Sequence, residues 1–82
     1  MLKQLLFTCL SDSNQLQALR NKGVELRSYI KNGRTAHLYE LSNFYVEVVF
    51  KFDDTEMLPE KITVFQNVEE WSNYITRRSS VE

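Results

Sequence analysis

The amino-acid sequence predicts an α+β fold: a two-layer sandwich in which a four-stranded antiparallel meander has helices on one face, in the order α-α-β-β-β-β-α. Three observations predict it. Apolar residues recur with helical spacing up to residue 22, and from residue 24 onward they alternate with polar residues as in a strand. Two dipeptides that suit tight turns, Asn32-Gly33 and Ser42-Asn43, separate the alternating stretches. A second helical pattern follows after residue 67.

Length and composition indicate one globular domain. A chain of 82 residues is too short to divide into two halves that each fold unaided, so we expect a single domain over residues 1–78 and a frayed tail over residues 79–82. Hydrophobic residues make up 43% of the chain, which is typical of a folded protein and not of a disordered one. The net charge of -1 provides no domain-wide positive field, and this disfavours nucleic acid as a partner.

The first ten residues carry an apolar helical pattern. Leu2, Leu5, Leu6 and Cys9 have the spacing of one helix face, which predicts that Cys9 is a small core residue. The apolar run of about six residues is shorter than the hydrophobic region of a signal peptide and far shorter than a membrane span. Cys9 is the only cysteine, so no intramolecular disulfide can form. We therefore expect a cytoplasmic protein without membrane contact.

A second helix is expected to begin after the cluster Ser11-Asp12-Ser13, whose side chains suit a helix N-cap. Leu16 and Leu19 mark its apolar face. Gly23 follows a basic segment, which predicts that the helix ends there with a left-handed glycine cap.

The stretch from Val24 to Leu41 is predicted to be a β-hairpin around Asn32-Gly33. A two-residue turn sets the strand register, since each residue then has one partner across the turn. The predicted pairs are Lys31 with Arg34, Ile30 with Thr35, Ser28 with His37, Leu26 with Tyr39, and Val24 with Leu41.

The third strand identifies the core face of the sheet. Its alternate residues are uniformly apolar: Phe44, Val46, Val48, Phe50 and Phe52. A second two-residue turn at Ser42-Asn43 pairs Leu41 with Phe44, Tyr39 with Val46, His37 with Val48, and Thr35 with Phe50. Both turns thus place the same residues inward, and this agreement supports the predicted meander.

The remaining elements are a short fourth strand and a final helix. Residues 53–60 hold the only proline and are expected to form a loop before a strand over residues 61–65. Asn67 is expected to cap a helix that presents Val68, Trp71 and Ile75 on one face, with Tyr74 beside them. We expect Trp71 to cover the same core face as Leu5, Leu16 and Leu19.

Few residues suggest a catalytic or metal-binding site. His37 is the only histidine, and the predicted register points it inward, where a hydrogen-bonded core histidine is expected. His37 and Cys9 alone cannot complete a zinc site, and the acidic residues Asp53, Asp54 and Glu56 lack the pattern of a calcium loop. We therefore expect no catalytic residue, no metal and no cofactor.

The outer face of the sheet carries an apolar strip instead of the polar residues usual on a wetted sheet. The strip consists of Tyr29, Ala36, Leu38, Tyr45 and Val49, and charged residues that include Lys31 and Glu47 rim it. We expect an open interface there. The leading hypothesis is a small, non-enzymatic interaction or regulatory module that binds a protein partner, or forms a homodimer, through this face.

An alternative hypothesis is a small ribonuclease of the toxin type. His37 would be its acid-base group, and Arg34, Lys31 and Lys51 would contact phosphate. This alternative requires His37 on the same face as the three basic residues, whereas the predicted register places them on opposite faces.

Overall fold

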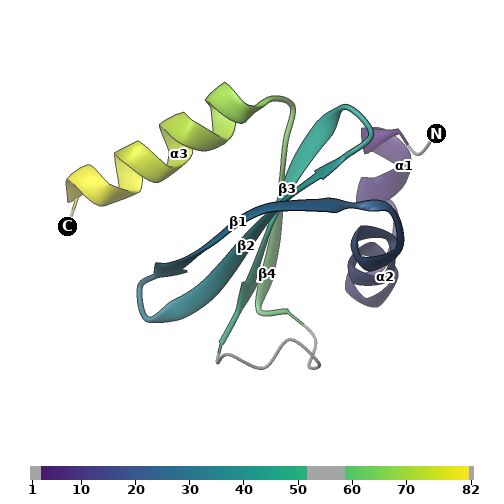
Figure 1. The fold of residues 1–82 in the computed structure, drawn as a ribbon, viewed down its shortest axis with the longest axis horizontal. Coiled ribbons are helices and arrows are strands. Elements are labelled where there is room, and N and C mark those ends of the chain that lie inside the picture. Colours follow the sequence, from purple (N-terminus) through teal and green to yellow (C-terminus); the bar gives the residue numbers. More distant parts are fainter. Residues whose placement is uncertain (1–2, 52–58, 82) are drawn as a thin grey trace.

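The structure is a computed structural model that describes residues 3–51 and 59–81, with side chains up to residue 76. The expected element order is confirmed (Figure 1). The elements are α1 (Gln4–Thr8), α2 (Asp12–Lys22), β1 (Val24–Lys31), β2 (Arg34–Leu41), β3 (Phe44–Phe50), β4 (Lys61–Phe65) and α3 (Val68–Val81).

The four strands form one antiparallel sheet in the order β1-β2-β3-β4, which confirms the meander. Asn32 and Gly33 have φ angles of 53° and 76°, the positive values that a tight hairpin turn requires. Ser42 also has a positive φ, of 57°. The predicted pairing of β2 with β3 is confirmed throughout, from Leu41 opposite Phe44 to Thr35 opposite Phe50.

The register of β1 against β2 is confirmed only near the turn. Lys31, Ile30 and Ser28 have their predicted partners, but a β-bulge between Glu25 and Arg27 shifts the rest of the strand. Glu25, and not Leu26, therefore lies opposite Tyr39, and Val24 lies opposite Glu40 instead of Leu41. The extra residue moves Glu25 to the face on which Leu26 was predicted, and Val24 and Leu26 remain exposed.

The inner face of the sheet packs against α1 and α2. The predicted core residues of β3 are buried there with Leu16 and Leu19, as expected. The predicted face of α1 is wrong, however, because Phe7 is fully buried while Leu5 is 75% exposed and Cys9 is also exposed. With only five residues, α1 presents little more than one side chain to the sheet, and the aromatic ring of Phe7 buries the largest apolar area.

The N-cap of α2 agrees with the prediction, whereas its C-cap differs. The side chain of Ser11 accepts a hydrogen bond from the Asn14 N–H at 3.2 Å, so the predicted N-cap is confirmed. Gly23 does end the helix, but with an extended backbone (φ -78°) and not a left-handed one. A Cβ at this position would lie 2.6 Å from the Leu19 carbonyl oxygen, so the close approach of the backbone explains the glycine.

The position of α3 differs from the prediction. Figure 1 shows α3 on one side of the sheet and α1 and α2 on the other, so the sheet is the middle of three layers. Trp71 packs with Leu38 and Phe65 of the outer face. Only two residues separate Phe65 at the end of β4 from the start of α3, and α1 and α2 already occupy the inner face. The short connection therefore holds the helix on the outer side.

Some predictions fall on residues outside this description. Phe52 and the acidic residues Asp53, Asp54 and Glu56 lie in the stretch 52–58, which is outside the described residues. The helix α3 continues to Val81, and fraying of residues 79–82 stays a prediction.

Candidate functional site

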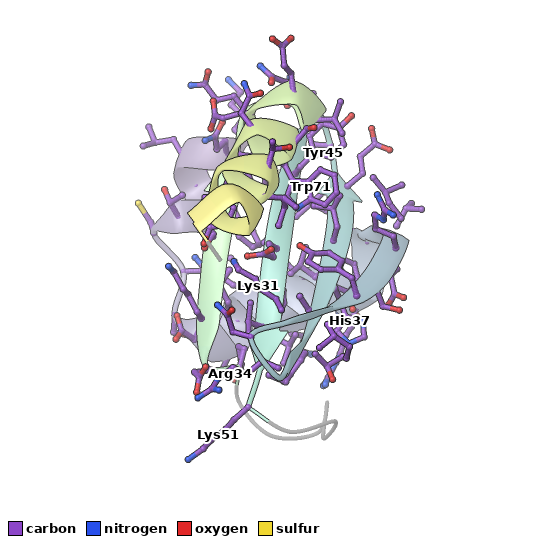
Figure 2. The ribbon with its side chains drawn as sticks, turned by 90° about the vertical axis from the view of Figure 1, so that its left-hand side faces the viewer. Lys31, Arg34, His37, Tyr45, Lys51 and Trp71 are labelled. Carbon is purple, nitrogen blue, oxygen red and sulfur yellow. The ribbon has the colours of Figure 1, made fainter. Side chains whose placement is uncertain are left out.

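The predicted interface strip lies beneath α3. Ala36, Leu38 and Val49 are 0%, 1% and 5% exposed, and Tyr29 and Tyr45 are partly buried. Figure 2 shows α3 in front of the sheet, with Trp71 and Tyr45 close together beneath it. The strip does come together as predicted, but a helix of the same chain covers it, so it is not an open surface.

A buried polar cluster holds α3 against the sheet. Glu47, predicted to lie on an exposed rim, is completely buried. Its carboxylate accepts hydrogen bonds from the Tyr29 hydroxyl and, at 2.9 Å, from Lys31 Nζ. Lys31 also donates to the Tyr74 hydroxyl at 2.8 Å, and the Trp71 indole N–H donates to the Tyr29 hydroxyl at 3.0 Å. Two residues of α3 are thereby linked to one buried carboxylate.

The environment of Tyr29 disfavours its ionisation. Burial and the hydrogen bond to Glu47 raise the pKa of the Tyr29 hydroxyl well above its ordinary value. The Tyr29 and Trp71 rings meet edge to face, with centroids 5.9 Å apart, and the Arg27 guanidinium lies 5.6 Å from the Trp71 ring centre. Tyr29 therefore acts as a neutral donor within a packed aromatic group.

A pocket with a volume of about 220 Å³ opens beside this cluster. We call it the basic pocket. It lies where the β1–β2 hairpin, β3, the start of β4 and α3 meet, and its lining residues are Lys31, Asn32, Arg34, Val49, Glu60, Lys61 and Tyr74.

Salt bridges hold two cations of the basic pocket in place. Arg34 Nε lies 2.9 Å from a Glu60 carboxylate oxygen, and Arg34 Nη1 donates to the Asn32 carbonyl at 3.2 Å. Lys31 is held by Glu47 and Tyr74. Of the three basic residues grouped from the sequence, the structure brings Lys31 and Arg34 to the pocket, whereas Lys51 points away at the end of the sheet (Figure 2).

His37 lies on the inner face, apart from the basic pocket. It pairs with Ser28 and Val48, as predicted, and its ring packs against Phe50 with centroids 5.7 Å apart. The expected hydrogen bond is missing, because neither ring nitrogen has a hydrogen-bond partner among the described residues; Nδ1 only approaches a Glu25 oxygen at 3.4 Å. The arrangement that the ribonuclease alternative requires is not formed.

The most exposed apolar residues lie elsewhere, on β1 and α1. On β1, Val24, Leu26 and Ile30 are 57%, 45% and 72% exposed. This strand forms one edge of the sheet, so the backbone groups on its outer side pair with no strand of the described chain. We call this side of β1 the free edge.

Several site residues were missed by the sequence analysis. Glu47 was predicted to be exposed because a charged residue in an alternating strand normally faces water. Lys61 and Glu60 reach the basic pocket through the pairing of β3 with β4, in which Val49 lies opposite Lys61. No pattern in the sequence specifies that pairing, because β3 ends at Phe50 and β4 begins only at Lys61.

Within residues 3–51 and 59–81, His, Cys, Asp and Glu side chains nowhere gather in threes as a metal site would require. None of the helices in this part of the chain has both the length and the hydrophobicity for a membrane crossing. Comparison of the chain with protein-family models, with curated proteins and with solved structures gives no match.

Proposed function

We propose that this protein is a small, non-enzymatic interaction module that associates with a second copy of itself through the free edge of β1. The observation that carries the proposal is an edge strand with three exposed apolar side chains, of which Ile30 is 72% exposed. Unpaired strand edges are templates for pairing with another strand. The single cysteine supports a reducing compartment such as the cytoplasm as its location.

The hairpin geometry identifies the backbone groups available for pairing. In an antiparallel ladder, residues alternate between pairs that exchange hydrogen bonds and pairs that do not. Lys31 and Arg34 flank the two-residue turn and form a hydrogen-bonded pair. Because the two kinds of pair alternate, the backbone groups of Tyr29 are hydrogen-bonded to its partner Ala36 in β2. Ser28 and Ile30 then direct their N–H and C=O groups outward, to the free edge.

The sequence of β1 suits two-fold pairing centred on Ser28. In that register, Ile30 of one copy lies opposite Leu26 of the other, so two exposed apolar side chains meet. Arg27 lies opposite Tyr29, and no like charges face each other across the pair. A two-fold contact of this kind needs only one self-complementary surface. The bulge next to Leu26 bends the strand and ends the pairing there.

A non-enzymatic role is supported by the distance between the side chains that could take part in catalysis. His37 is on the inner face, while Lys31 and Arg34 line a pocket on the outer face. General acid-base catalysis needs such groups within hydrogen-bond reach of one substrate. The sheet lies between them.

Size-exclusion chromatography with light scattering tests the proposal. The parent protein should have twice the 9.7 kDa mass of the chain at high concentration. Ser28→Pro removes an outward N–H without removing a bond to β2, and Ile30→Lys places a charge in the contact; both variants should be monomeric with unchanged circular dichroism. Leu5→Lys is the matched control, because Leu5 is equally exposed (75%) but lies on α1.

Two results would contradict the proposal. A parent protein that stays monomeric at high concentration would exclude self-association. Dissociation by Leu5→Lys but not by Ile30→Lys would move the contact from β1 to α1.

A further inference from the structure

We propose that the basic pocket binds the phosphate group of a small molecule. The pocket is lined by three cations, Lys31, Arg34 and Lys61, and by one carboxylate, that of Glu60. With the buried Glu47 that pairs with Lys31, the three cations and two carboxylates sum to a net charge of +1, whereas the chain as a whole carries -1. A phosphate group, with a charge approaching -2, complements this lining.

The donors of the pocket support the assignment. Arg34 has five N–H groups, of which Nε bonds to Glu60 and one Nη1 hydrogen to Asn32. Lys31 uses two of its three donors on Glu47 and Tyr74. The side chain of Lys61 is exposed, so its ammonium group is accessible to a ligand. Each cation therefore keeps donors that a phosphate oxygen can accept from.

The pocket is also held in shape before any ligand enters. Glu47 and Tyr74 fix the ammonium group of Lys31, and Glu60 and the Asn32 carbonyl fix the guanidinium of Arg34. Side chains that are already ordered lose less entropy when a ligand binds. The guanidinium is planar and matches two phosphate oxygens at once.

The size of the pocket favours a small ligand over a nucleic-acid strand. Its volume of about 220 Å³ is far above the ~10–15 Å³ that holds one water molecule, and suffices for a phosphate group with part of its carrier. A polyanionic strand needs a continuous basic groove, whereas this pocket presents three basic side chains and the chain has a net charge of -1.

Titration with inorganic phosphate, followed by two-dimensional amide NMR, tests the inference. We expect saturable shifts at Asn32, Arg34 and Lys61. Arg34→Gln and Lys61→Gln should each weaken phosphate binding about tenfold, the effect of losing one charge-assisted hydrogen bond. Lys22→Gln, on α2 and across the sheet, removes the same charge and should leave binding unchanged. Lys61 is exposed, so its variant stays folded even if that of Arg34 does not.

Three outcomes would overturn the inference. Shifts that do not saturate would exclude a site. An equal loss of phosphate binding in Lys22→Gln would show that phosphate is attracted by the net charge of the protein alone. Acetate binding as tightly as phosphate would exclude a phosphate-specific pocket. These results are independent of self-association through the free edge of β1.

Discussion

The carboxylate of Glu47 lies between the sheet and α3 with no solvent exposure. A buried carboxylate is tolerated only when donors replace the water that it loses. Tyr29 and Lys31 each donate to one of its oxygens, and they also contact Trp71 and Tyr74 of α3. An apolar contact alone would let the helix rotate or slide, whereas these directional bonds favour a single placement of α3 on the sheet.

Replacing Lys31 should expose the energetic cost of this arrangement. Lys31→Met should lower the free energy of unfolding by about 3–5 kcal/mol, because Glu47 becomes a buried charge without its cation. The double variant Lys31→Met/Glu47→Gln should recover part of that loss, since the remaining amide is neutral. Urea unfolding followed by circular dichroism measures both. A double variant no more stable than Lys31→Met would show that Lys31 contributes by packing and not by charge.

At the scale of elements, α3 is the helix that turns an exposed apolar strip into a second core. It contributes Trp71, which packs with Leu38 and Phe65, and Tyr74, whose ring lies 5.4 Å from that of Phe65. Both Leu38 and Trp71 are nearly inaccessible to solvent. Trp71 is the only tryptophan, so its fluorescence reports whether α3 is docked.

Truncating Leu38 should weaken this docking. Leu38→Ala should cost about 2–5 kcal/mol of stability, because a buried side chain is removed from a packed contact. The urea midpoints from Trp71 fluorescence and from circular dichroism should fall together. Leu5→Ala, at a site 75% exposed, should change stability by less than about 0.5 kcal/mol. A Leu38→Ala protein that unfolds like the parent would mean that α3 is not docked on this face.

At the scale of the whole molecule, one sheet separates two cores, and each core contains a tyrosine that resists ionisation. Tyr29 lies on the α3 side, where burial and the hydrogen bond to Glu47 raise its pKa. Tyr39 packs against the inner core, where burial and the nearby Glu25 carboxylate raise its pKa. Both hydroxyls stay protonated in the folded chain at a pH at which the unfolded chain loses these protons.

Alkaline pH should therefore destabilise the protein. Above about pH 10, the ordinary pKa of tyrosine, the unfolded state binds fewer protons than the folded state, so the free energy of unfolding falls as the pH rises. Tyr29→Phe removes one such titrating hydroxyl. The free energy of unfolding should then fall less steeply with pH, by about 1.4 kcal/mol per pH unit. Urea unfolding at several alkaline pH values measures the slope. Parallel slopes for parent and variant would show that Tyr29 ionises equally in both states.

The sequence by itself determined the features that depend on near neighbours in the chain. Asn32-Gly33 sets the hairpin because both turn residues need a positive φ, and the second turn sets the pairing of β2 with β3. Ser11 and Asn67 cap their helices with bonds that span three residues. The inward residues of β3 follow from strict alternation, since one face of a strand must be apolar to be buried.

Only the tertiary structure decided which elements meet. The side of the sheet that α3 covers depends on the two-residue connection after Phe65 and on the space already taken by α1 and α2. The burial of Glu47 depends on partners from β1 and α3, and the basic pocket depends on the pairing of β3 with β4. Periodicity identifies the apolar face of each element, but it does not identify the partner of that face, because the free energy of packing is shared among residues distant in the chain.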